Sequence, residues 1–203
     1  MSFDKTKLNK NYPLNYLFDL ETTEYSDDIL GIDEAGRGAL AGPVVIAGVI
    51  PRYDNPIVGV TDSKKLSSAK RDEYFDKIIN HPDYKYHIAI IPHTTIDRIN
   101  ILNATKKGMI ECIDKLKDNC KHIITDSVKL SYTDKIIYTI IKADFKSAAV
   151  ACASILAKVT RDRILIQLSD KYTGYDLRKN KGYPTKFHIN ALNKIGVYDI
   201  HRK

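Results

Sequence analysis

Short apolar runs alternate with longer amphipathic segments along most of the chain. Runs rich in Val and Ile are typical of buried strands, whereas apolar positions three or four residues apart indicate one face of a helix. Because three strands come first and helices then alternate with strands, the pattern predicts an α/β fold with one mixed sheet and helices on its faces. The expected strands are 29–33, 43–51, 57–60, 86–91, 122–126 and 136–142, and the expected helices are 68–80, 94–116, 144–168 and 186–195.

Polar residues mark the expected helix starts. Ser67 and Thr94 are N-cap candidates, since a side-chain hydroxyl accepts a hydrogen bond from a free amide of the first helical turn. An interruption is expected near 100–103 in the helix that follows Thr94. The helix that starts at Asp144 is rich in alanine and has no breaker up to about Leu168.

The first 28 residues lack clear periodicity, and Pro13 interrupts them. We therefore expect an N-terminal appendage at 1–28 and one domain at 29–203 that ends in a helical region. The apolar runs are about half of the roughly 20 residues that a membrane span needs, and the polar start is unlike a signal peptide. Three cysteines without a C-x-x-C pair are typical of reduced, buried thiols. We expect a cytoplasmic monomer with no membrane partner.

Charge is unevenly distributed along the 203 residues. The formal net charge is +7, but residues 1–30 hold six acids and three lysines, whereas residues 171–203 hold eight bases and two acids. A basic body of this kind suits a polyanion such as nucleic acid. A lysine-rich surface that only keeps the protein soluble explains the charge equally well.

Glycines crowd the segment 31–43, which reads Gly-Ile-Asp-Glu-Ala-Gly-Arg-Gly-Ala-Leu-Ala-Gly-Pro. Gly36, Gly38 and Ala41 satisfy the G-x-G-x-x-A dinucleotide-binding pattern, which would indicate an oxidoreductase. That pattern requires a helix directly afterwards, but a Val- and Ile-rich strand is expected here. The glycines therefore suit close backbone approach to some other ligand.

Acidic residues stand at the ends of elements that we expect to be neighbours. Asp33 and Glu34 end one apolar strand, Asp126 ends another, and Asp144 starts an apolar helix. Each acid alone fits a turn or a helix cap. Together, buried carboxylates repel one another unless cations hold them, and oxygen ligands suit Mg²⁺ or Mn²⁺. In a basic protein this combination indicates phosphodiester hydrolysis by two metal ions.

These residues belong to an ordered series of motifs, spread over roughly 29–202, that resembles ribonuclease HII, the type 2 ribonuclease H family. The series comprises Gly31-Ile-Asp-Glu-Ala-Gly-Arg-Gly38, Asp62-Ser-Lys-Lys-Leu-Ser67, Asn103-Ala-Thr105, Asp126, Asp144-x-Lys146-Ser147, Ala153-Ser-Ile-Leu-Ala-Lys-Val159, Arg161-Asp-Arg163, Lys181-Gly-Tyr-Pro-Thr-Lys186 and Ile200-His-Arg202.

The resemblance implies the ribonuclease H fold, a mixed five-stranded sheet flanked by helices, with three antiparallel strands first. It implies that Asp33, Glu34, Asp126 and Asp144 are the catalytic, metal-binding acids and hold two divalent cations, Mn²⁺ or Mg²⁺. The implied substrates are the RNA strand of RNA–DNA hybrids and single ribonucleotides in duplex DNA. The implied cut lies 5′ to the ribonucleotide and leaves 3′-OH and 5′-phosphate ends, which serves ribonucleotide removal from DNA.

The resemblance also implies substrate-binding residues. Gly36, Arg37 and Gly38 resemble the sensor of the ribose 2′-hydroxyl, the group that distinguishes RNA from DNA. Tyr183 resembles the tyrosine that stacks on the sugar of the next deoxyribonucleotide, although a half-buried aromatic in a turn fits it too. Further phosphate or backbone contacts, which are alternatively solvated surface or local caps, are Lys64, Asn103, Lys146 and Ser147.

Some positions depart from the family pattern. Ser127 stands where glycine is usual, which should alter the loop and not the ligand Asp126. The chain stops at Lys203, where relatives often continue, so weaker duplex affinity is expected. His188 and His201 are expected to be structural, because four acids already supply hard ligands. The remaining alternative is a non-catalytic nucleic-acid-binding module, which predicts binding without magnesium-dependent cleavage.

Overall fold

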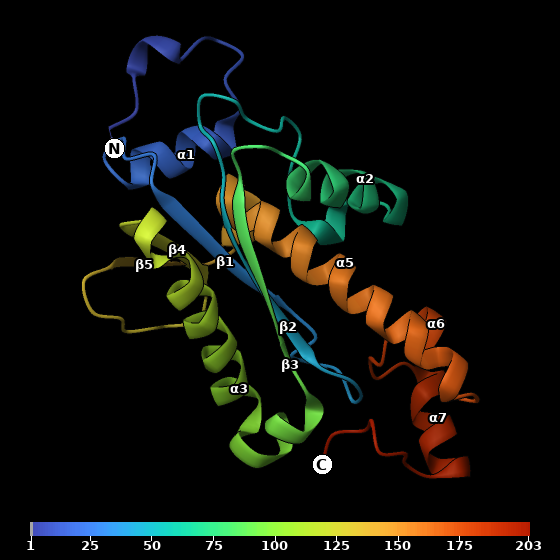
Figure 1. Ribbon diagram of the computed structural model, residues 1–203. Coiled ribbons are helices and arrows are strands. Elements are labelled where there is room, and N and C mark those ends of the chain that lie inside the picture. Colours follow the sequence, from blue (N-terminus) through green and yellow to red (C-terminus); the bar gives the residue numbers. More distant parts are fainter. Residues whose placement is uncertain (1) are drawn as a thin grey trace.

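A five-stranded mixed sheet forms the centre of the protein in the computed structural model, which describes residues 2–203 (Figure 1). The strand order is β3-β2-β1-β4-β5. Strands β1, β2 and β3 pair antiparallel, whereas β4 runs parallel to both β1 and β5. The strands are β1 (Ile29–Ala35), β2 (Val44–Ile50), β3 (Lys85–Ile91), β4 (His122–Asp126) and β5 (Ile136–Ile140).

Helices cover both faces of this sheet, with α3 on one side and α5 on the other (Figure 1). Alternate residues of β1 and β2 therefore enter two different cores. Ile29 and Val45 pack in the core with α5, whereas Leu30 and Ile46 pack in the core with α3. The helices are α1 (Leu14–Thr22), α2 (Ser68–Ile79), α3 (His93–Leu116), α4 (Ala143–Lys146), α5 (Ala148–Lys171), α6 (Leu177–Asn180) and α7 (Lys186–Ile195), with short 3-10 turns at Lys5–Lys7, Ser63–Lys65 and Lys117–Asn119.

The five-stranded mixed sheet flanked by helices confirms the predicted fold class, but one expected strand is wrong. Residues 57–60 form a loop, and the third antiparallel strand is β3, which follows α2. The loop has physical causes on both sides, because Pro56 restricts the backbone before it and Gly59 has a φ of 90°. Two apolar residues in such a setting do not extend into a ladder.

The helix boundaries follow local capping chemistry. The Ser67 hydroxyl accepts from the Lys70 N–H and starts α2, as predicted. The prediction for Thr94 is wrong, because α3 begins at His93 and its N-cap is Pro92, two residues before Thr94. The interruption predicted near 100–103 is confirmed, since Asn100 has φ 64° and ψ 166°.

The single helix predicted from Asp144 is two helices. Ser147 has an extended backbone between α4 and α5, and its hydroxyl accepts from the Val150 N–H as the N-cap of α5. Helix α5 then packs directly on the backbone of β1, where a Cβ on Gly31 would lie 2.1 Å from the carbonyl carbon of Ala149. This contact fixes the start of α5 against the central strand.

The N-terminal segment packs against the rest of the protein. Tyr16 and Leu20 of α1 are fully buried in the core that contains α5. The boundary at residue 28 stays a prediction.

The three cysteines are free and buried, as expected. No helix among residues 2–203 is long and apolar enough to cross a membrane.

Candidate active site

Four carboxylates gather where β4 ends beside β1, and we call Asp33, Glu34, Asp126 and Asp144 the acidic edge. The parallel pairing of Ile32 with Thr125 places the next residues, Asp33 and Asp126, at the same point on adjacent strands. The Asp126 Oδ1 accepts from the N–H of Lys142 at 3.0 Å and of Ala143 at 3.4 Å. These two bonds join the end of β4 to the start of α4, which carries Asp144.

Asp33 is buried, with 7% of its surface exposed. Burial, followed by the negative charges of Glu34 and Asp144, raises the pKa of Asp33 well above its ordinary value. The Ser154 hydroxyl opposes this shift by hydrogen bonding, and Ser154 is itself 3.0 Å from the Ser63 hydroxyl. The raised pKa favours the protonated form of Asp33 unless a cation binds beside it.

Glu34 is only partly neutralised. Its Oε1 accepts from the Arg37 Nη1 at 3.2 Å, whereas its buried Oε2 has no hydrogen-bond partner among the described residues. Burial raises the pKa of Glu34, Arg37 opposes the rise, and the charge of Asp126 adds to it. A buried carboxylate oxygen without a donor is costly unless a ligand completes it.

Asp144 faces the Lys64 ammonium, with 3.4 Å between Oδ2 and Nζ. The Asp144 side chain is 7% exposed and that of Lys64 is 78% exposed, so this ion pair lies on the solvent side. Burial and the charges of Asp62 and Asp126 raise the pKa of Asp144, and Lys64 opposes them. One largely exposed lysine therefore does not neutralise this group of acids.

The acidic edge fits hard divalent cations. Its donors are all carboxylate oxygens, the ligand type of Mg²⁺ and Mn²⁺. Within residues 2–203, no three His, Cys, Asp or Glu side chains are arranged so that they could hold a metal ion as they stand. Three of the acids are instead hydrogen-bonded to local partners: Asp126 to backbone N–H groups, Asp144 to Lys64, and Glu34 to Arg37.

A second cluster forms around Arg161 of α5, which is 0% exposed. Its guanidinium donates to the carbonyls of Pro43 at 2.9 Å, Lys181 at 2.8 Å and Ala41 at 3.0 Å. It also lies 5.1 Å from the centroid of the Tyr183 ring. We call Arg161 with the loops 36–43 and 181–183 the Arg161 hub.

Two glycines of the hub differ in the space that surrounds them. A Cβ on Gly36 would lie 2.0 Å from the Arg161 Nε, and the φ of Gly36 is 100°. A Cβ on Gly38 would meet nothing within 4 Å, and its φ is not in the left-handed region. The protein itself thus requires glycine at 36, whereas the exposed position 38 leaves open space for a ligand.

The C-terminal residues and two histidines close the hub. Arg202 donates to the carbonyls of Gly42 and Pro43 at 3.0 and 3.1 Å. The His188 Nδ1 is 3.0 Å from the Tyr183 carbonyl oxygen, and its Nε2 is 3.1 Å from the His201 Nε2. The pair thus fastens the backbone of Tyr183, in agreement with the structural role expected for both histidines.

The other predicted substrate-binding residues lie on different elements and differ in exposure. Arg37 and Lys146 are exposed, Ser147 is buried as the cap of α5, and Asn103 is exposed just after the kink of α3. The Asn103 N–H donates to the Asn100 Oδ1 at 3.0 Å, within α3 itself. Their roles toward a substrate stay predictions.

The motif series contains Arg161 but gives it no role. The available signal was its place on α5, four residues after Ala157 and four before Leu165, both of which are fully buried. A charged residue in such an apolar stripe indicates a buried hydrogen-bonding role. What it binds depended on loops far away in the sequence.

The dinucleotide-binding alternative is wrong. Strand β2 begins at Val44, directly after the glycine-rich segment, where that reading requires a helix.

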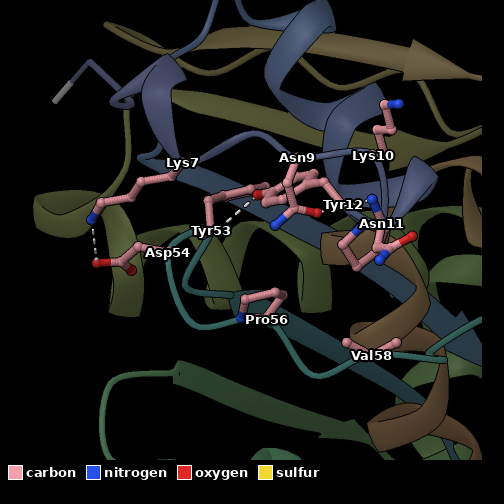
Figure 2. Close-up of a pocket in the computed structure, with 10 residues that line it drawn as sticks. Lys7, Asn9, Lys10, Asn11, Tyr12, Tyr53, Asp54, Pro56 and Val58 are labelled. Atoms are coloured by element: carbon pink, nitrogen blue, oxygen red, sulfur yellow. Dashed lines mark hydrogen bonds and ion pairs between the residues drawn. The ribbon is translucent and has the colours of Figure 1, made fainter.

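A surface pocket drawn in Figure 2 lies between residues 7–13 and the loop 53–58, with a Lys7–Asp54 ion pair at 3.5 Å. None of its lining residues belongs to the acidic edge.

Comparison with known proteins decides the family. Residues 30–203 match the model of the family described as Ribonuclease HII. The chain belongs to the ribonuclease HII family. Ribonuclease HII of Listeria monocytogenes serovar 1/2a is 45% identical over 190 residues, which cover 90% of this chain and 72% of that protein. Ribonuclease HII of Rickettsia bellii (strain OSU 85-389) is 42% identical over 202 residues, which cover 100% of this chain and 95% of that protein.

A solved structure agrees with this assignment. The complex of PCNA with RNase HII from Archaeoglobus fulgidus contains a chain similar to this one, with a TM-score of 0.72 and 27% identity, over 86% of this chain and 93% of that chain. This protein is therefore a ribonuclease H enzyme of type 2. Membership of this family indicates endonuclease activity on RNA–DNA hybrids.

Proposed function

We propose that this ribonuclease HII cuts a DNA duplex on the 5′ side of an embedded ribonucleotide, and the RNA strand of RNA–DNA hybrids, with 3′-OH and 5′-phosphate products. The observation that carries the proposal is the acidic edge, where carboxylates with raised pKa values face one another with too few cations. Such an excess of negative charge favours bound metal ions, because without them the acids are neutralised only by taking up protons.

Asp33, Glu34, Asp126 and Asp144 would hold two divalent cations, Mg²⁺ or Mn²⁺. When bound, such a pair activates a water for in-line attack and stabilises the leaving 3′-oxygen. The unpartnered Oε2 of Glu34 is a vacant acceptor for this purpose. Lys64, which faces Asp144, is free to turn toward a substrate phosphate, because its side chain is largely exposed.

Selection of the ribonucleotide falls to the Arg161 hub. Main-chain groups of residues 36–38 would contact the 2′-hydroxyl, for which the open space at Gly38 leaves room. The Tyr183 ring would stack on the following deoxyribose, held by the Arg161 guanidinium and the His188 contact to its carbonyl. Lys146, Arg37, Asn103 and Ser147 would contribute phosphate or backbone contacts.

Both regions are contacted by the same helix, α5, which supports their joint action. Ser154 of α5 serves Asp33, and Arg161 of the same helix touches Gly36. Seven residues of helix correspond to about 10 Å, roughly the span of two or three nucleotides of a duplex strand. The biological role that we propose is ribonucleotide removal from DNA in the cytoplasm, by a monomer.

The test is cleavage of a labelled DNA duplex that contains one ribonucleotide, beside an RNA–DNA hybrid and an all-DNA duplex, with Mg²⁺ or Mn²⁺. We expect one cut 5′ to the ribonucleotide, cleavage of the hybrid, and no cut in DNA. Cleavage of the hybrid alone would refute the role of Tyr183 at the junction. Binding without cleavage would support the non-catalytic module instead.

A further inference from the structure

A carboxylate outside the acidic edge lies buried beneath the start of α5. Asp19 of α1 is 0% exposed, and its Oδ2 accepts from the Ala149 N–H and from the Tyr53 hydroxyl, both at 3.0 Å. Its Oδ1 has no hydrogen-bond partner among the described residues. The Ser147 hydroxyl and the Ala148 N–H lie near enough to favour its charged form.

Helix α1 precedes the residues that match the family model, which begin at residue 30. It nevertheless contacts both α4 and α5, and it lies beside the start of α5 in Figure 1. Tyr16 and Leu20, which flank Asp19 on α1, are fully buried in the core that holds the first turns of α5. The N-terminal segment is thus positioned to act on the junction of α4 and α5.

The path from Asp19 to the acidic edge is short. Asp19 holds the first turn of α5 through Ala149. Ser147, between the helices, donates its N–H to the Ala143 carbonyl at 2.8 Å. Ala143 in turn donates its N–H to Asp126 and directly precedes Asp144. Any shift of the start of α5 therefore moves two acids.

We propose that Asp19 is a positioning residue of the metal site: its carboxylate fixes the start of α5 and thereby the orientation of Asp144 and its link to Asp126. This inference rests on the metal-binding role proposed above. An apolar side chain would fill the same space at a lower desolvation cost, but it would not fix the direction of the N–H groups of the helix start.

The carboxylate gives this contact a direction that packing alone lacks. Free N–H groups at the start of a helix favour a negative partner, and a buried acceptor restricts them to one arrangement. Removal of an outer partner of a metal ligand costs about 10- to 100-fold in metal affinity or activity in other proteins. Asp19 is such a partner at one further remove, through the backbone.

The experiment compares Asp19→Asn with Tyr53→Phe in the full chain. Tyr53→Phe removes a hydrogen bond to the same Oδ2 but leaves the contact with α5 intact. Mn²⁺ binding is measured by the loss of free Mn²⁺ signal in electron paramagnetic resonance, and kcat and KM are measured on the single-ribonucleotide duplex. Thermal unfolding reports the fold of each variant.

For Asp19→Asn we expect the Mn²⁺ Kd to rise and kcat to fall, each by about tenfold, with KM unchanged. For Tyr53→Phe we expect a Kd within about twofold of the wild type, despite a similar loss of one hydrogen bond. Should Asp19→Asn fail to fold, Ser147→Ala tests the same path from the other side, with the same expected changes.

A folded Asp19→Asn protein with wild-type Mn²⁺ affinity and kcat would overturn the inference, as would Tyr53→Phe with an equal loss. Asp144→Asn separates these outcomes from failure of the proposed function. If the wild type does not bind Mn²⁺, or if Asp144→Asn binds it equally well, then the metal site itself is refuted.

Discussion

The acidic edge and the Arg161 hub treat buried charge in opposite ways. Arg161 has three carbonyl partners and an aromatic ring, so its charge is fully accommodated by the protein. The acidic edge has a Glu34 oxygen without a hydrogen-bond partner among residues 2–203, and the pKa of Asp33 there is raised by burial and by the neighbouring acids. The hub is complete by itself, whereas the acidic edge is completed by ligands.

This difference suits the two proposed functions, recognition of the ribonucleotide and binding of divalent cations. Sensing a 2′-hydroxyl requires a backbone held in one shape, because a shift of about 1 Å can cost 100-fold in rate. Holding divalent cations requires unneutralised negative charge, which destabilises the protein until the ions bind. Substitutions should therefore separate stability from activity in opposite directions in the two regions.

Asp33→Asn should have the largest effect on activity. We expect cleavage to fall by more than about 100-fold, since even outer partners of metal ligands are worth 10- to 100-fold. The metal-free protein should be as stable as the wild type or more stable, because a buried charge with like-charged neighbours is removed. Denaturant unfolding in a chelator checks this, and a loss of stability would contradict the comparison.

Arg161→Lys should act mainly on stability. A lysine reaches fewer of the three carbonyls, and each buried acceptor left alone costs about 1–3 kcal/mol. We expect a decrease in unfolding free energy of about 2–5 kcal/mol, with Mn²⁺ affinity retained in the folded protein. Junction cleavage should fall more than hybrid cleavage. Parallel loss of Mn²⁺ affinity would show that the two regions are not separable.

The pH dependence of stability sharpens the comparison through Asp19. Burial raises the pKa of Asp19 to about 7 from 3.8, so the folded state holds this proton more tightly than the unfolded state. The resulting stabilisation is complete below about pH 4 and is lost as the pH rises through 7, a change of about 4 kcal/mol. Asp19→Asn should remove this part of the pH dependence, measured by denaturant unfolding between pH 4 and 8. An unchanged profile would mean that other groups carry it.

Substitutions of the two glycines of the hub should give the smallest effects, on stability at Gly36 and on junction cleavage at Gly38. Gly36→Ala places a Cβ against Arg161 at a positive φ and should cost about 1–3 kcal/mol of stability. Gly38→Ala meets no protein atom, so its stability should stay within about 0.5 kcal/mol of the wild type. Its junction cleavage should nevertheless fall by about tenfold or more, because the Cβ occupies ligand space. Equal cleavage by wild type and Gly38→Ala would place the sensor elsewhere.

The sequence predicts the strands better than the joints between elements. Runs of Val and Ile located β2 and β4, because burial on both faces leaves few polar positions in them. The acids followed from their places at strand ends together with the family resemblance. The loop at 57–60 and the break at Ser147 were missed, because each depends on a local backbone conformation that apolar patterning does not report.

The hub was beyond sequence reasoning for a different reason. Arg161 binds carbonyls, which every residue carries, so its partners leave no mark in the sequence. The same holds for Asp19, whose partner on α5 is the backbone N–H of an alanine. Side chains that bind main-chain groups far away in the sequence are revealed only by the tertiary structure.

The central position of β1 has a consequence for the folding pathway. Its antiparallel partner β2 follows within a short loop, whereas its parallel partner β4 comes much later in the chain. Local pairings close with less entropy loss than distant ones, so the β1–β2 hairpin should form first and β4 should dock late. Asp33 and Glu34 are then in place before Asp126 and Asp144 join them. A partly folded chain therefore lacks the full set of acids, and nuclease competence should be acquired only in the last steps of folding.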